Sequence, residues 1–151
     1  MQSDKRTRAR ELAMQALYQL DVQGQDLLEF LGEFFSENES DESARKLASG
    51  WTRGAWENLK QCDELIVAST IKWHLSRLSA VDKSILRLSV YQLRFCPDIP
   101  PRVVINEGIE LAKKFSTAQS SGFVNGVLDA VLKKMKAESS AQGAHRAPGA
   151  E

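Results

Sequence analysis

The sequence predicts an all-α protein that folds as a single compact domain, and three observations carry this prediction. Apolar residues recur at spacings of three and four along most of the chain, as they do on one face of a helix. No segment shows the strict apolar–polar alternation of a strand. Only four prolines and nine glycines interrupt the 151 residues, and a chain of this length forms one core. We therefore expect one bundle of about six or seven helices.

Four helical segments are predicted in the first half of the chain. They cover residues 3–22, 27–35, 44–59 and 63–73. Gly24 ends the first helix and Asp63 caps the fourth. Residues 36–43 read SENESDES, an acidic and serine-rich run that predicts a solvated loop. Gly50 and Gly54 lie inside the third helix, and their spacing indicates either the close approach of a neighbouring helix or a break.

The central helix of the bundle is predicted over 81–95. Ser79, followed three residues later by Asp82, resembles a capping box that begins this helix. Its apolar residues surround the helix axis on most sides, which is typical of a helix in the middle of a bundle. The chain after it contains Pro97, Pro100 and Pro101, which end the helix and impose an extended connection.

Two further helices follow, over 101–115 and 120–132, and complete the predicted core. Apolar residues disappear after Met135. We therefore expect a helical domain over 1–135 and a disordered carboxyl-terminal tail over 136–151.

The charge pattern provides the first indication of function. The formal net charge is zero, so any attraction to nucleic acid must come from a local patch. Four cations gather at the start of the chain: Lys5, Arg6, Arg8 and Arg10. Arg6 and Arg10 project from one side of the first helix, Tyr18 follows near the same stripe, and Lys5 and Arg8 flank it. Cations beside an aromatic ring suit single-stranded RNA. They are equally well explained as solvated terminal charges beside a half-buried tyrosine.

Two other side chains have both a functional and a structural interpretation. Phe123, at the start of the last helix, can stack on a base or belong to the core. Asp82 can contact a basic partner or simply complement the helix dipole. His74 and His145 do not form a metal-binding set, and Cys62 and Cys96 have no metal-like spacing. We expect no cofactor and no metal.

No catalytic motif or targeting segment is recognisable. The chain lacks nucleophile-elbow, zinc-protease, phosphate-loop and dinucleotide signatures, so we expect that it is not an enzyme. Its amino terminus is polar, and no apolar stretch reaches membrane-spanning length. These features predict a cytoplasmic protein that does not act at a membrane.

Four segments together resemble one known family. They read RTRARELAMQALYQLD, AVDKSILRLSVYQL, VVINEGIELAKKFS and GFVNGVLDAVLKK, in this order. In this order and spacing they are similar to the NusB family, and the likeness extends from Lys5 to Lys134. It implies about seven helices in two packed helical bundles. It also implies a transcription antitermination factor that binds the boxA element of nascent ribosomal RNA leader transcripts, together with the ribosomal protein NusE, in a complex on RNA polymerase.

The resemblance also implies roles for particular residues. The basic cluster, Tyr18 and Phe123 would contact RNA, and Asp82 would contact NusE. Family members often carry a basic residue directly before the phenylalanine, but here Gly122 occupies that position. This difference puts a phosphate contact at the position in doubt and leaves base stacking by Phe123 open.

Three alternatives stay open at this point. The chain can be a helical adaptor that binds only protein, with the arginines serving solubility. It can also be the RNA-recognition part of a ribosomal RNA cytosine methyltransferase, because such enzymes carry NusB-like domains. Finally, a homodimer would hide the basic first helix until RNA or NusE displaces the second copy.

Overall fold

The structure, a computed structural model, describes residues 2–70 and 75–146. This part of the chain is helical throughout, with seven α-helices and two short 3-10 helices. The elements are α1 (Gln2–Gln23), η1 (Gln25–Phe30), α2 (Leu31–Asn38), α3 (Glu42–Glu57), α4 (Leu59–Ala68), η2 (Leu75–Arg77), α5 (Ala80–Phe95), α6 (Pro101–Phe115) and α7 (Ser120–Arg146). The predicted all-α fold is confirmed.

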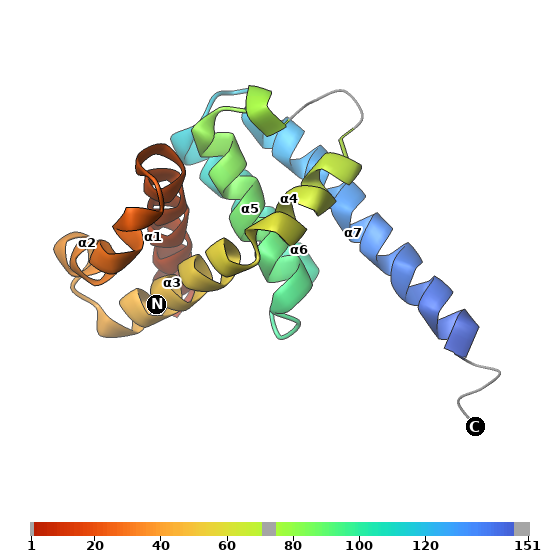
Figure 1. Ribbon diagram of the computed structural model, residues 1–151, viewed down its shortest axis with the longest axis horizontal. Helices are drawn as coiled ribbons and strands as arrows, with labels where there is room; N and C mark the ends of the chain where they lie inside the picture. Colours follow the sequence, from red (N-terminus) through yellow and green to blue (C-terminus); the bar gives the residue numbers. More distant parts are fainter. Residues whose placement is uncertain (1, 71–74, 147–151) are drawn as a thin grey trace.

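Helix α5 is the centre of the fold, as the sequence predicted. Every residue from Ser84 to Val90 is buried, and the helix packs against α1, α3, α4, α6 and α7. Figure 1 shows α1, α2 and α3 on one side of α5 and α7 on the other. The two packed bundles therefore share one buried helix, which has to be apolar on several faces.

The two glycines of α3 have different surroundings. The helix is continuous through both of them, so no break occurs. A Cβ atom at Gly54 would collide with the phenol ring of Tyr91 on α5, whereas a Cβ atom at Gly50 would meet nothing within 4 Å. Gly54 thus permits the close approach of α3 and α5, while Gly50 is not required by packing.

The acidic loop is shorter than predicted. Helix α2 continues to Asn38 and α3 begins at Glu42, so only three residues of the expected loop 36–43 lie between the helices. Asp41 is the N-cap of α3, and its carboxylate accepts a hydrogen bond of 2.9 Å from the Ala44 N–H. Serine and acidic residues are frequent at helix starts as well as in loops, which is why composition alone overestimated the loop.

The predicted cap at Asp63 is wrong. Helix α4 begins at Leu59, so Asp63 lies inside it. The Asp63 carboxylate instead receives two hydrogen bonds of 2.9 Å from Arg87 of α5, and Arg87 donates a third, also of 2.9 Å, to Asp21 of α1. Lys83 lies 3.2 Å from the other oxygen of Asp21. This ionic cluster joins α1, α4 and α5.

The carboxyl-terminal segment differs from the predicted disordered tail. Helix α7 continues to Arg146, well past Lys136, and its far end extends beyond the other helices (Figure 1). Residues 136–141 are exposed, so the extension does not depend on burial. Its alanine, glutamate, lysine and glutamine residues favour helix without a packing partner.

No helix among the described residues is long and apolar enough to cross a membrane.

Candidate nucleic-acid interface

Helix α1 is held in place by an apolar face that packs on α3 and α5. Its buried apolar residues are Ala9, Leu12, Ala13, Met14, Ala16, Leu17 and Leu20. This spacing leaves Lys5 and Arg6 exposed at the first turns of the helix. Lys5 is 3.4 Å from Asp41, the cap of α3. Both side chains are exposed enough for solvent to screen the pair, so Lys5 can exchange this carboxylate for a phosphate.

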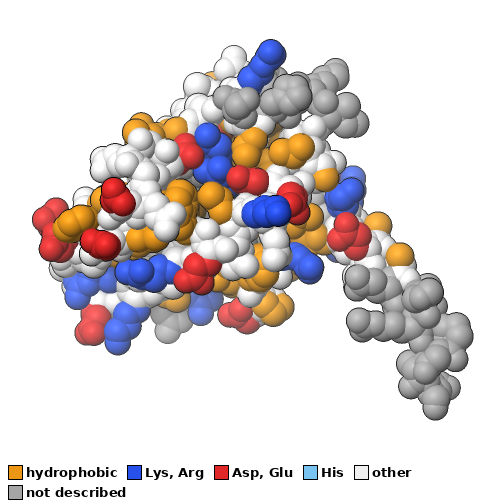
Figure 2. Space-filling model, viewed as in Figure 1, with side chains coloured by type: hydrophobic (Ala, Val, Ile, Leu, Met, Phe, Trp, Pro, Cys, Tyr) orange, Lys and Arg blue, Asp and Glu red, His pale blue; other side chains and the backbone are white. Residues whose placement is uncertain are grey.

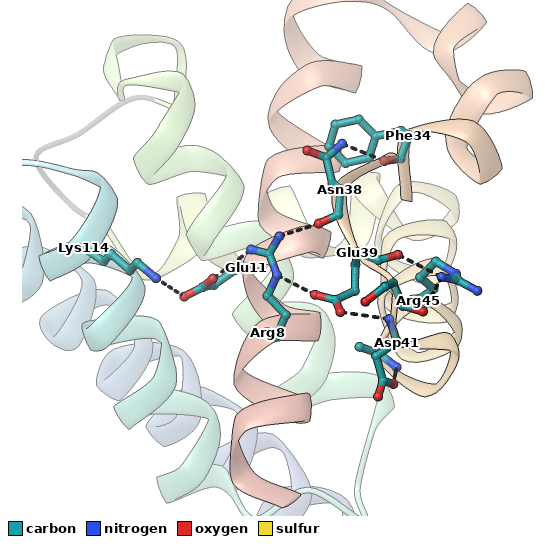
Figure 3. A network of polar contacts seen from close by, with 10 residues as sticks. Arg8, Glu11, Phe34, Asn38, Glu39, Asp41, Arg45 and Lys114 are labelled. Atoms are coloured by element: carbon teal, nitrogen blue, oxygen red, sulfur yellow. Dashed lines mark hydrogen bonds and ion pairs between the residues drawn. The ribbon is translucent and has the colours of Figure 1, made fainter. Parts of the chain in front are cut away.

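Arg8 is bound to the start of the α2–α3 connection. Its Nε donates to Glu39 at 3.0 Å, its Nη2 donates to the Asn38 carbonyl at 2.8 Å, and its Nη1 donates to Glu11 at 3.1 Å. Figure 3 shows these groups around the guanidinium. The Asp41 N–H and the Arg8 side chain hold the pKa of Glu39 below its ordinary value. Arg8 therefore has its donors bound to two carboxylates and one carbonyl, and a guanidinium bound in this way can also bind a phosphate.

Arg10 is not part of an RNA-binding surface, and this is the main correction to the predicted site. It is 2% exposed and lies 5.1 Å over the ring of Trp51. Its Nε donates to Gln92 and its Nη1 to Glu107, each at 3.3 Å. Burial lowers its pKa, yet a guanidinium stays charged. Arg10 is therefore a core residue that joins α1 to α3, α5 and α6.

The surface charges around α1 alternate in sign. Figure 2 shows Lys and Arg side chains interleaved with Asp and Glu at the end of the molecule formed by α1, α2 and α3. This face carries no unbroken basic surface. Lys5 and Arg8 are each paired with an acidic side chain, and solvent and salt screen such exposed pairs.

Tyr18 lies in a different place from the basic side chains. It is half-buried in a hollow of about 390 Å³, which we call the Tyr18 hollow. The hollow is lined by Met14, Gln15, Tyr18, Gln19, Phe34, Asn38, Val81 and Phe115. No lysine or arginine belongs to this lining, but Arg8 donates to the carbonyl of Asn38 and Lys114 lies 5.3 Å from the ring of Phe115, so two cations lie at the edge of the hollow.

Phe123 and Asp82 line the same pocket, although the sequence suggested different partners for them. This Phe123 pocket has a volume of about 210 Å³. Its lining consists of Arg77, Leu78, Ser79, Asp82, Thr117, Gln119, Ser120 and Phe123. An aromatic ring can stack on a base, and a carboxylate can accept a hydrogen bond from the amino group of the base. A guanidinium can bind the phosphate of the same nucleotide.

The Asp82 carboxylate is already bonded within the fold. Ser116 donates to it at 2.6 Å and Ser120 at 3.0 Å, which ties the start of α5 to the turn between α6 and α7. Ser79 caps α5 by accepting from the Asp82 N–H at 3.1 Å, as predicted. A contact between Asp82 and NusE stays a prediction.

Two cations near these pockets were missed at the sequence level. Arg77 lines the Phe123 pocket from η2, and Lys114 of α6 is 2.7 Å from Glu11 of α1. Both are distant in sequence from the basic cluster at the start of the chain, and only the packing of the helices brings them near the pockets. His74 lies outside the described residues, as does the side chain of His145.

The described residues contain no group of three or more potential metal ligands. Cys62 is buried, and burial raises the pKa of its thiol to about 12. It is therefore an unreactive core side chain.

Comparison with known proteins places this arrangement in a family. Residues 7–133 match the model of the NusB family. The chain belongs to the NusB family. The transcription antitermination protein NusB of Syntrophus aciditrophicus is 42% identical over 127 residues, covering 84% of this chain and 79% of that protein. NusB of Symbiobacterium thermophilum is 40% identical over 151 residues, covering 92% and 96%.

Solved structures of the NusB family have the same fold. T. maritima NusB superposes with a TM-score of 0.77 at 43% identity, covering 85% of this chain and 90% of that one. NusB in a complex of the antitermination factors NusB and NusE with double-stranded RNA gives a TM-score of 0.79 at 30% identity, covering 87% and 98%.

Proposed function

We propose that this protein is a transcription antitermination factor that binds boxA RNA of ribosomal RNA leader transcripts together with NusE, in a complex on RNA polymerase. The observation that carries the proposal is the match to NusB proteins over most of the chain, including one solved with NusE and RNA. On this proposal the protein binds without catalysing a reaction, and it works in the cytoplasm, where its transcript is made.

Two surfaces support RNA binding in different ways. At the start of α1, the side chains of Lys5, Arg6 and Arg8 reach the surface and would bind phosphates without reading sequence. In the Phe123 pocket, the ring beside Asp82 and Arg77 suits a base that has left its stack. The first surface would supply attraction, and the second would supply preference for one sequence.

The test measures RNA binding by fluorescence anisotropy over a range of salt concentrations. The probes are a boxA RNA and a scrambled RNA, each as a single strand and as a duplex, with and without NusE. The proposal expects tighter binding to boxA than to the scrambled RNA and a further gain with NusE. No measurable binding to either RNA together with intact NusE binding would support the protein-only adaptor, and equal binding to both RNAs would contradict the preference for boxA.

Variants separate the two surfaces. Arg6→Ala and Lys5→Ala should each reduce the slope of log affinity against log salt by about 0.7 for a single strand if one phosphate contact is lost. Phe123→Leu keeps apolar volume but removes the ring, so it should weaken boxA binding by about 1 kcal/mol or more with little change in that slope. Arg10 is left unchanged in this set because its loss would disturb the fold.

The NusE contact is tested at Asp82 with a change that preserves shape. Asp82→Asn removes the charge while its remaining carbonyl oxygen can still accept from Ser116 or Ser120. We expect weaker NusE binding and unchanged thermal stability. A variant that loses stability and both ligands together would assign Asp82 to the fold instead.

A further inference from the structure

The connection between α1 and α6 carries an inference that rests on the proposed function and deepens it. Glu11 of α1 is 8% exposed, and its two oxygens bond different cations. One oxygen accepts from Arg8 Nη1 at 3.1 Å and the other from Lys114 Nζ at 2.7 Å. Figure 3 shows Lys114 reaching from α6 toward Glu11, with Arg8 on the far side of the carboxylate. A nearly buried carboxylate thus holds together two cations that are 106 positions apart in the sequence.

Lys114 can bind a ligand without leaving Glu11. Its side chain is 60% exposed, and an ammonium group has three donors, of which Glu11 takes one. Its Nζ also lies 5.3 Å from the ring centroid of Phe115. The Glu11 carboxylate and the Phe115 ring restrict this ammonium group more than the ammonium group of an ordinary surface lysine is restricted. Binding a phosphate therefore costs Lys114 less side-chain entropy.

Lys114 also lies between the two surfaces of the proposed RNA site. At one end it contacts Glu11, the partner of Arg8. At the other end, Thr117 follows three residues later and lines the Phe123 pocket, and three residues span at most about 10 Å. An RNA strand that contacts Arg8 and also enters the Phe123 pocket has to cross the end of α6. Arg77 lines that pocket from η2, and Gly122 adds no second cation there.

We propose that Lys114 is a phosphate-binding residue of the RNA site, which bridges the basic start of α1 and the Phe123 pocket. The adjacent Lys113 makes a matched control. It is equally exposed, but it pairs at 3.5 Å with Glu110 of its own helix and is rotated by about 100° around the axis of α6.

The test compares Lys114→Ala with Lys113→Ala in the full chain, using a boxA RNA and a scrambled RNA across salt. Lys114→Ala should bind both RNAs severalfold more weakly, because a phosphate contact carries no sequence information. It should also lower the salt slope by about 0.7. Lys114→Arg should keep both affinity and slope, and Lys113→Ala should bind like the unaltered protein.

Two results would overturn the proposal: a Lys114→Ala protein that binds RNA like the unaltered protein, or equal losses of affinity in both lysine variants. Lys114→Ala also removes one of the two cations on Glu11, so thermal unfolding of every variant is measured and binding is compared at a temperature where all of them are folded. The preference of the unaltered protein for boxA over the scrambled RNA shows whether the role of Lys114 or the proposed function itself has failed. If the unaltered protein prefers boxA while Lys114→Ala changes nothing, only the bridging role is lost. If it shows no preference for boxA, the proposed function itself fails.

Discussion

The guanidinium of Arg10 lies over the indole ring of Trp51, 5.1 Å from its centroid. It also donates to Gln92 and Glu107. Arg10→Met removes the charge and leaves Glu107 without a buried partner cation, so it should reduce the free energy of unfolding by about 2–3 kcal/mol. Urea denaturation followed by circular dichroism measures this loss.

Arg6 provides the control for that prediction, because it is exposed in the same helix. Arg6→Met should change stability by no more than about 0.5 kcal/mol. If Arg10→Met were as stable as Arg6→Met, the buried contacts of Arg10 would be of no consequence for folding.

The pairing of Arg8 with Glu39 predicts that removing a negative charge can improve RNA binding. On the proposed function, Arg8 must release Glu39 and Asn38 before it can grip a phosphate with two donors. Glu39→Gln weakens this competing contact and should raise RNA affinity on the order of twofold at low salt. Glu37→Gln makes the same change in charge at an exposed position of α2 and should have a smaller effect. Weaker binding by Glu39→Gln would mean that Glu39 orients Arg8 for RNA.

The ionic cluster around Arg87 makes stability dependent on pH. Burial alone would raise the pKa of Asp21, but the hydrogen bonds from Arg87 and Lys83 outweigh it and lower the pKa. A lowered folded-state pKa adds stability above the unfolded value of about 3.9, and this stability is lost as pH falls through the folded value.

Asp21→Asn tests this dependence. At pH 7 the free energy of unfolding should be larger for the unaltered protein than for Asp21→Asn. This difference between the two proteins should become smaller below about pH 4. Urea denaturation at pH 7, 5, 4 and 3 measures the difference. A difference that stays constant down to pH 3 would exclude titration of Asp21 as its cause.

The two glycines of α3 predict opposite effects for the same substitution. Gly54→Ala places a methyl group against Tyr91 and should destabilise the protein by about 1–3 kcal/mol. Gly50→Ala meets open space and should stabilise it by about 0.5–1 kcal/mol through helix propensity. Thermal unfolding of both variants gives the comparison. Adding Tyr91→Leu should relieve most of the loss caused by Gly54→Ala and leave the gain from Gly50→Ala unchanged.

The sequence predicts the helices well because their apolar spacing reflects which face each one buries. The buried position of α5 follows directly from apolar residues around its axis. Helix ends are predicted less well, because the same residue types serve as caps and as loops. Asp63 looks like a cap locally, but its partner Arg87 lies 24 residues away.

The candidate site is predicted less completely than the fold. Arg6 and Arg10 share one stripe of a helix, yet Arg6 is exposed and Arg10 is buried. Arg10 is buried because Trp51 of α3 and Glu107 of α6 contact it. Likewise, Asp82 finds its serine partners 34 and 38 residues away. Local spacing identifies which residue types are available, and only the packing of distant helices decides which of them reach the surface.

The contact between Arg10 and Glu107 has a consequence for synthesis of the chain. The two residues are 97 positions apart, so at about 5–20 residues per second the ribosome needs on the order of 5–20 seconds to supply the partner. The central helix α5 also emerges late relative to α1. Until α5 is made, only η1, α2 and α3 are available to cover the apolar face of α1. The apolar face of α1 is therefore covered in steps, and Arg10 gains its partner Glu107 only after α6 has been made.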